Sequence, residues 1–292
     1  MKKRVFTGVG TALITPFSGG RIDYTSLERI IDMQIEAEVD ALIVGGTTGE
    51  AATLSDHERY ELYSFAKDKI SGRCPLILGT GTNDTAVAIK HTKFAEELGC
   101  DGVLLVTPYY NKGTERGIIH HYRKISEETR LPIILYNVPS RTGVNLSQGT
   151  LECLGEIENI VGIKEASDSA DRLVSISAMS DKLGLYAGND TQFFTALALG
   201  GMGVISVVSN IAPRETVAIY KAFCSGNIDE ARDRQIQLLP LIHALFVETN
   251  PAPVKHAMHR LGLCSEEMRL PLCEISSENK RLVDIELSRF GM

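Results

Sequence analysis

The sequence predicts an α/β protein: a (β/α)8 barrel, or TIM barrel, with a C-terminal helical extension. Eight short apolar runs recur along the 292 residues, at positions 9–14, 41–44, 76–78, 103–106, 133–136, 161–164, 183–186 and 204–208. Most of these runs are about 27–35 residues apart, and one strand-helix unit needs roughly 30 residues. Eight such units in succession are typical of a closed barrel of parallel strands.

Helical patterns fill the gaps between these runs. Apolar residues recur at the three- and four-residue spacing of an amphipathic helix over positions 56–70, 84–98 and 115–129. Ser55 and Glu58 predict a capping box at the start of the first helix, and Gly99 predicts the end of the second. An open doubly wound sheet is the alternative fold. The glycine-rich stretch 79–84 fits neither the dinucleotide fingerprint nor the P-loop, which favours the barrel.

The chain is expected to have two parts. Residues 1–224 would form the barrel domain, because the strand rhythm stops at about residue 225. Residues 225–292 would form the helical extension, with helices over positions 228–246, 253–261 and 277–290. Proline and glycine residues punctuate these three helices.

Composition excludes several classes of function. The chain is 43% hydrophobic and 23% charged, with a net charge of -7, which argues against non-specific binding to nucleic acid or to anionic membranes. No apolar stretch reaches the roughly 18 residues of a membrane span, and no signal-peptide pattern follows the basic start. The six cysteines are scattered without a C-x-x-C pair. We therefore expect free thiols, no zinc site and a cytoplasmic location.

Lys164 is the strongest candidate for a catalytic residue. It follows the apolar run 160–163, and burial at that point would disfavour its charged form and lower its pKa. A neutral amine can attack a carbonyl carbon and form a Schiff base. The alternative is a lysine that ends a strand and extends its ammonium group into water.

Other candidate site residues lie at or just after the ends of the predicted strands, where the active site of such a barrel is built. They are Thr47, Thr48, Tyr109, Tyr110, Tyr136, Arg141, Gly188 and, within the eighth run, Ile205. An amine, phenols, paired hydroxyls and a guanidinium at one barrel mouth would suit carbonyl chemistry on a keto acid. The seven histidines show no metal-ligand spacing, so no metal is expected.

Several motifs resemble a known family from end to end. Gly-Thr-Thr-Gly-Glu begins at residue 46, Val-Thr-Pro-Tyr-Tyr-Asn at 106, Leu-Tyr-Asn-Val-Pro-Ser-Arg-Thr-Gly at 135, and Gly-Ile-Lys-Glu-Ala at 162. Together they are similar to the dihydrodipicolinate synthase (4-hydroxy-tetrahydrodipicolinate synthase) family. That family belongs to the pyruvate-dependent Schiff-base aldolase/lyase superfamily, which includes N-acetylneuraminate lyase.

The resemblance implies a reaction and its catalytic residues. Pyruvate would condense with L-aspartate 4-semialdehyde to give 4-hydroxy-tetrahydrodipicolinate, the first committed step of diaminopimelate and lysine biosynthesis. Lys164 would form the imine, so no separate cofactor would be required. Tyr136 would be the general acid/base, and Thr47 and Tyr110 would complete its proton relay. The Tyr110 equivalent reaches the neighbouring subunit's site, which implies a homotetramer built as a dimer of dimers.

The resemblance also implies the substrate contacts. Thr48 would hold the pyruvate carboxylate, and Gly188 and Ile205 would line the pyruvate pocket. Arg141 would bind the semialdehyde carboxylate. Two alternatives remain: a keto-deoxy-sugar acid or N-acetylneuraminate-type lyase using the same imine, and a non-catalytic barrel. Arg141 favours the synthase over the first, and the complete set of chemical groups disfavours the second.

One departure concerns feedback inhibition by L-lysine, which some members of the family show. The position of their effector-binding acidic residue matches Val87, and two of their histidines match Asp56 and Arg59. Asn83 and Tyr109 are retained. Because Val87 cannot pair with an ammonium group and Arg59 would repel it, we expect lysine inhibition to be weak or absent.

Overall fold

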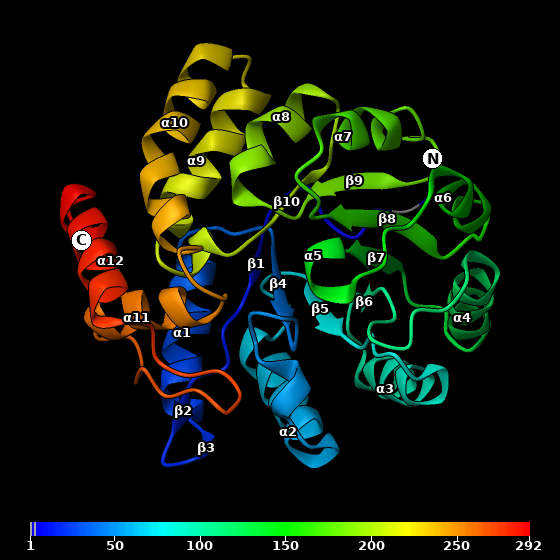
Figure 1. Ribbon diagram of the computed structural model, residues 1–292, viewed down its shortest axis with the longest axis horizontal. Coiled ribbons are helices and arrows are strands. Elements are labelled where there is room, and N and C mark those ends of the chain that lie inside the picture. Colours follow the sequence, from blue (N-terminus) through cyan, green and yellow to red (C-terminus); the bar gives the residue numbers. More distant parts are fainter. Residues whose placement is uncertain (1, 3) are drawn as a thin grey trace. The chain divides into compact units, whose positions relative to one another are not determined.

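Eight strands close into a parallel barrel in the computed structural model, which describes residue 2 and residues 4–292 (Figure 1). The strand order around the barrel is β1-β10-β9-β8-β7-β6-β5-β4. Outside it, β2 (Phe17–Ser18) and β3 (Arg21–Ile22) form an antiparallel pair. The predicted (β/α)8 class is therefore confirmed. Within the described part of the chain, no helix is long and apolar enough to cross a membrane.

By internal contacts the chain divides into two compact units. The first comprises the N-terminal segment through Gly8 and residues 75–205; the second comprises residues 9–74 and 206–292. The predicted boundary between residues 224 and 225 lies in the turn that joins α9 (Pro213–Cys224) to α10 (Ile228–Ala244). Both of those helices belong to the second unit, and the boundary stays a prediction.

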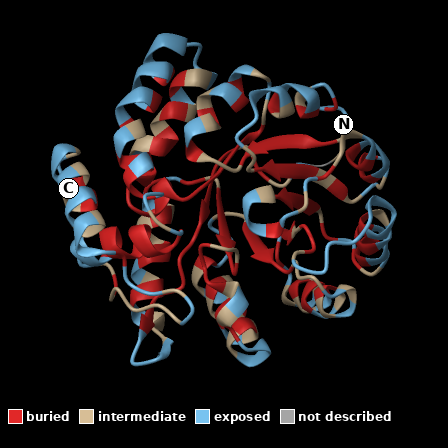
Figure 2. Ribbon diagram, viewed as in Figure 1, coloured by how far each residue is buried: buried red, intermediate tan, exposed pale blue. Residues whose placement is uncertain are grey.

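In the first unit, buried strands alternate with helices whose outer faces are exposed (Figure 2). The strands read as nearly continuous apolar runs because parallel strands are covered on both faces. The elements are β5 (Leu76–Gly79), α3 (Thr85–Leu98), β6 (Gly102–Val106), α4 (Glu115–Glu127), β7 (Ile133–Asn137), α5 (Pro139–Thr142), α6 (Gln148–Gly155), β8 (Ile160–Glu165), α7 (Ala170–Ser177), β9 (Gly184–Ala187), α8 (Phe193–Ala198) and β10 (Gly203–Ser206), whose last residue belongs to the second unit.

The register of β8 against β7 changes once. Ile133 pairs with Ile160, but Ile134 pairs with Gly162, so β8 carries one extra residue, Val161, at its amino end. Such an insertion is a β-bulge, which bends a strand and re-aims the side chains that follow it. Beyond the bulge the pairing is regular to the ends of both strands.

The second unit carries β1 (Gly8–Ala12), whose first residue belongs to the first unit, and β4 (Ala41–Val44), which pair in parallel. Helix α10 packs against α9 and α12, and α11 also packs against α12. The remaining helices of this unit are α1 (Tyr24–Glu36), α2 (Asp56–Ile70), α11 (Ala252–Arg260) and α12 (Ser277–Arg289).

The predicted helix caps are confirmed. The Ser55 side chain accepts from the Glu58 N–H and the Glu58 carboxylate accepts from the Ser55 N–H, which is the reciprocal capping box. Gly99 ends α3 in the left-handed conformation at φ +74°.

Two predicted strand ends were wrong. The first run was expected over positions 9–14 and the last over 204–208, but the strands end at Ala12 and Ser206. The Asn210 side chain explains both. Its amide donates to the carbonyls of Ala12 and Val207, both at 2.9 Å, and its oxygen accepts from the Ile14 N–H at 3.2 Å. Because a side chain satisfies these backbone groups, they do not need a strand ladder.

Candidate active site

Lys164 lies one residue before the end of β8, where its side chain is only 5% exposed. Burial lowers its pKa from 10.5 to about 8; Asp190 opposes that shift and Arg141 adds to it. A substantial fraction of this amine is therefore neutral near pH 8, as a nucleophile requires.

Tyr136 lies beside Lys164 because the two residues are paired in register across β7 and β8. The Lys164 Nζ is 4.5 Å from the centroid of the Tyr136 ring. Tyr136 is buried as well, with 7% of its surface exposed. A phenol next to an amine gives a group that can donate or accept a proton during carbonyl chemistry.

Arg141 lies on α5, the single helical turn that follows β7. Pro139 opens this turn and Gly143 closes it at φ +66°, where other residue types are strained. Arg141 is exposed, and its charge contributes to lowering the Lys164 pKa. The guanidinium is thus close enough to act on the amine and remains accessible to an anionic ligand.

Asp190 is an acidic residue whose charge acts on Lys164. It is 4% exposed at the start of the short helical turn after β9, and its charge raises the Lys164 pKa against the effect of burial. Asp190 therefore keeps the pKa of the amine from falling further, a balance that only the folded geometry reveals.

Gly188 and Ile205 lie at the ends of β9 and β10. A Cβ on Gly188 would lie 2.6 Å from the Ala166 Cβ and 2.7 Å from the Glu165 carbonyl oxygen, so any side chain there would collide with the end of β8. The Gly188 N–H donates to that same carbonyl at 2.7 Å. Ile205 is fully buried in β10. Their predicted contact with pyruvate stays a prediction.

Thr47 and Thr48 lie in the second unit, in the tight turn after β4. Thr48 is 3% exposed, and its hydroxyl accepts from the Asn250 amide at 3.0 Å. Glu50 follows in the left-handed conformation at φ +52°. Sequence reasoning missed Asn250, because 202 residues separate it from Thr48 and no local signal links them.

Tyr110 differs from the other candidates in its exposure. It is 89% exposed in the loop between β6 and α4, and its backbone has the left-handed φ of +69°. A positive φ in a bulky residue is unusual and marks a constrained loop. Its predicted place in the proton relay stays a prediction.

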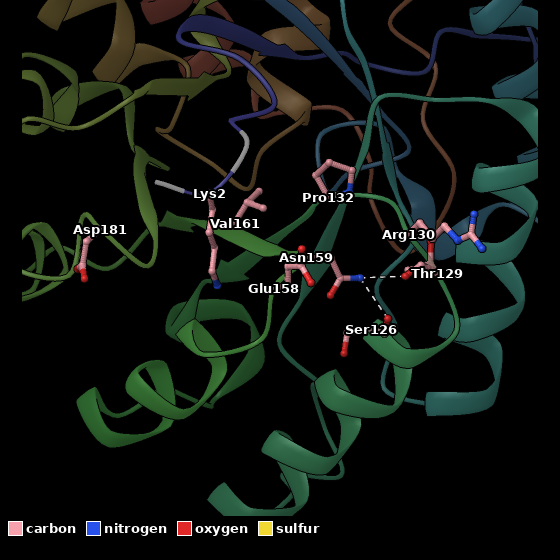
Figure 3. A pocket seen from close by; sticks show the side chains of 9 residues that line it. All are labelled: Lys2, Ser126, Thr129, Arg130, Pro132, Glu158, Asn159, Val161 and Asp181. Atoms are coloured by element: carbon pink, nitrogen blue, oxygen red, sulfur yellow. Dashed lines mark hydrogen bonds between the residues drawn. The ribbon is translucent and has the colours of Figure 1, made fainter.

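A pocket of about 780 Å³ lies near the amino ends of β7 and β8 (Figure 3), whereas Lys164 lies near the carboxyl end of β8. Pro132 and Asn159 on its wall precede β7 and β8, whereas barrel active sites form at the carboxyl ends of strands. Its described charged residues are of both signs, and the described lining residues form no catalytic constellation. The lining residues are Lys2, Ser126, Thr129, Arg130, Pro132, Glu158, Asn159, Val161 and Asp181.

Residue 2 and residues 4–292 contain no candidate metal site, because no three of their His, Cys, Asp or Glu side chains are grouped as metal ligands would be. His256 does contact two carboxylates, Glu266 at 2.8 Å and Asp284 at 3.2 Å. These hydrogen bonds join α11 to α12 and to the segment between them.

A buried lysine of lowered pKa beside a tyrosine, at the carboxyl end of a barrel strand, is the arrangement expected of a Schiff-base lyase. The model of the dihydrodipicolinate synthetase family matches residues 5–289, and the chain belongs to that family.

Individual relatives agree over their full length. The 4-hydroxy-tetrahydrodipicolinate synthase of Thermotoga neapolitana is 48% identical over 294 residues, covering 99% of this chain and 100% of its own. The crystal structure of dihydrodipicolinate synthase from Thermotoga maritima gives a TM-score of 0.96 at 44% identity, covering 99% of each chain. A structure described as a monomeric dihydrodipicolinate synthase variant gives 0.96 at 44% identity, covering 98% of this chain and 97% of that one.

Proposed function

We propose that this protein condenses pyruvate with L-aspartate 4-semialdehyde to give 4-hydroxy-tetrahydrodipicolinate. This lyase reaction is the first committed step of diaminopimelate and lysine biosynthesis. The observation that carries the proposal is Lys164, a buried amine whose pKa is lowered to about 8, beside Tyr136. The names of relatives at 48% and 46% identity support the same reaction.

The reaction begins when the neutral Lys164 amine attacks C2 of pyruvate. Loss of water gives an iminium ion, and loss of a proton from the methyl group gives an enamine. The enamine carbon attacks the aldehyde carbon of the semialdehyde, whose oxygen takes up a proton. The semialdehyde amine then attacks C2 and displaces Lys164, which closes the ring and restores the free enzyme. The iminium ion on Lys164 is the electron sink, so the reaction needs no metal or organic cofactor.

The other side chains move protons and hold carboxylates. Tyr136 gives and takes the protons of imine formation and release, and Thr47 and Tyr110 connect it to solvent. Thr48 binds the pyruvate carboxylate. A bidentate contact from Arg141 binds the carboxylate of the semialdehyde. Gly188 and Ile205 line the pyruvate pocket.

The active form is a homotetramer, built as a dimer of dimers in which Tyr110 is shared between subunits. The 89% exposure of Tyr110 supports this assignment. A tyrosine that is so exposed on its own subunit can be enclosed in an active site only by residues of a neighbouring subunit. The scattered cysteines favour a cytoplasmic location.

Product formation from the two purified substrates tests the proposal, with Lys164→Ala as the control. Turnover by the wild type alone supports both the reaction and the nucleophile. If the wild type shows no turnover, reductive trapping with pyruvate separates the remaining cases. A trapped adduct on Lys164 would indicate a lyase acting on another aldehyde, such as a keto-deoxy-sugar acid lyase. No adduct would indicate a barrel without this chemistry.

A further inference from the structure

Immediately after the pair formed by Tyr136 and Lys164, Asn137 and Glu165 form a second pair across β7 and β8. Successive residues of a strand point to opposite faces, so Asn137 and Glu165 lie on the face opposite that of Tyr136 and Lys164. Both are fully buried, with exposure of 0% each. A buried carboxylate directly beside the reactive lysine requires an explanation.

The Glu165 carboxylate is surrounded by hydrogen-bond donors. The Asn137 amide donates to both of its oxygens at 3.0 Å, and the Ser167 N–H donates to one of them at 2.9 Å. The Arg172 guanidinium, on α7, forms an ion pair with the carboxylate at 3.3 Å. Because every partner is a donor, the site fits the acceptor-only, ionised form of the side chain.

The same group of residues fixes the segment that follows Arg141. The Asn137 oxygen accepts from the Leu146 N–H at 3.1 Å, and its amide also donates to the Asn145 oxygen at 2.8 Å. Arg172 completes the connection by donating to the Leu146 carbonyl. Glu165 thereby links the ends of β7 and β8 to the chain that returns from the turn carrying Arg141.

We propose that Glu165 is a positioning residue for the reaction. Through Asn137 it sets Tyr136 beside Lys164, and through Asn137 and Arg172 it fixes the turn that presents Arg141. The proposal rests on the function proposed above. Glu165 itself touches no reacting atom, since its carboxylate lies on the far side of the strand pair.

The energetics distinguish this role from ordinary core packing. A buried ion pair is often no more stabilising than apolar residues of the same volume, so stability alone does not account for a charged cluster here. Glu165→Gln removes the charge that pairs with the Arg172 guanidinium, and it replaces one acceptor oxygen by an NH2 donor that faces the donors of Arg172 and Asn137. Those groups would then reorient, and a displacement of about 1 Å at reacting groups can cost roughly 100-fold in rate.

The test is Glu165→Gln, a variant of nearly the same size, with Asn159→Ala as the matched control. Asn159 immediately precedes the amino end of the same strand, where its amide donates to the Ser126 and Thr129 carbonyls at 3.1 and 2.9 Å (Figure 3). Both variants lose polar side-chain contacts at an end of β8, fully buried ones at Glu165 and half-buried ones at Asn159, but only Glu165 lies near Lys164. Turnover is divided by the number of Lys164 residues trapped with pyruvate, so unfolded protein does not count.

We expect Glu165→Gln to reduce turnover per trapped site about 100-fold and to raise the KM for the semialdehyde, because Arg141 shifts. Asn159→Ala should stay within threefold of the wild type on both measures. Arg172 lies nearer the surface, so Arg172→Ala replaces Glu165→Gln in the test if the latter does not fold. Arg172→Ala should reduce turnover per trapped site about tenfold and also raise the KM. The double variant with Asn137→Ala should lose less turnover than the product of the two single losses predicts.

The proposal is overturned if Glu165→Gln and Arg172→Ala lose thermal stability yet keep wild-type turnover per trapped site and wild-type KM. The wild-type assay separates this failure from a failure of the proposed function. If the wild type does not turn over at all, the function is wrong. If it does and the variants match it, only the role of Glu165 is wrong.

Discussion

Glu50 and Lys255 form an ion pair in which neither side chain is exposed to solvent. The Lys255 ammonium group also donates to the Glu267 carbonyl at 2.8 Å and lies 4.3 Å from the centroid of the Phe17 ring. Since Glu50 follows Thr48 by two residues, this pair anchors the turn that carries the candidate carboxylate-binding hydroxyl. Helix α11 thus supports the turn from within the second unit.

Lys255→Met should therefore destabilise the protein by about 3–5 kcal/mol, because it leaves the buried Glu50 carboxylate without its partner. Urea unfolding measures the change. Arg234→Ala, which removes an exposed i,i+4 pair with Glu230, is the control and should change stability by less than about 1 kcal/mol. If both variants changed the free energy of unfolding equally, the buried ion pair would contribute no more to stability than the exposed one.

The rate of imine formation should follow the Lys164 pKa of about 8. The neutral amine is the reacting form, so the initial rate of reductive trapping with pyruvate should rise roughly tenfold from pH 6 to pH 7 and level off above pH 8. Mass spectrometry of the cyanoborohydride-treated protein follows the adduct. A rate that continued to rise to pH 10 would mean that burial does not shift this lysine.

Lys164→Met should abolish turnover and stabilise the fold at pH 7. The unfolded chain holds this proton below pH 10.5, whereas the folded chain holds it only below about pH 8. The free energy of unfolding of the wild type therefore falls by about 3 kcal/mol as the pH drops from 10.5 to about 8. This loss of stability is still present in full at pH 7. Unfolding free energies at pH 7 and pH 10.5 measure it. A gain of equal size at both values would point to packing rather than charge.

Arg141→Ala should raise the KM for the semialdehyde at least tenfold while leaving pyruvate trapping possible. Because Arg141 helps to lower the Lys164 pKa, the trapping profile should also move to higher pH in this variant. Arg141→Lys keeps the charge but loses the planar fork, so it should restore the profile without restoring the KM. If Arg141→Ala abolished trapping altogether, its assigned role would be wrong.

Mixing two inactive variants tests whether Tyr110 acts across subunits. In a heteromer of Tyr110→Phe and Lys164→Ala chains, the site that keeps Lys164 would receive an intact Tyr110 from its neighbour. Differently tagged, co-expressed chains purified as heteromers should therefore regain activity, whereas each homomer stays at least tenfold below the wild type. If the heteromers stay as inactive as the homomers, Tyr110 acts within its own subunit.

Sequence periodicity was sufficient for the barrel and for the position of Lys164 near the end of a buried strand, because strand rhythm and strand ends are local properties of the chain. Periodicity could not predict the hydrogen bonds made by the side chains of Asn210, Asn250 and Glu165, since their partners lie from a few to about two hundred residues away. Side-chain amides and carboxylates carry no signal of which distant backbone they will meet.

Arg59 is a residue whose charge was known from the sequence but whose partners were not. Its charge led us to expect that it would repel a lysine effector. In the fold it is 9% exposed and donates to the Ala51 carbonyl at 2.6 Å and the Tyr63 hydroxyl at 3.2 Å. Its guanidinium is thus held by local hydrogen bonds, and weak lysine inhibition stays a prediction.

The extra residue in β8 determines which side chain faces Tyr136. If the bulge were absent, Val161 would pair with Ile134. Ile163 would then lie opposite Tyr136, and Lys164 would lie opposite Asn137. The Lys164 amine, the proposed nucleophile, and the Glu165 carboxylate would then exchange faces, with the amine turned away from Tyr136 and the carboxylate turned toward it. A single step of register at the amino ends of two strands thus determines which side chain the barrel places beside Tyr136 at their carboxyl ends.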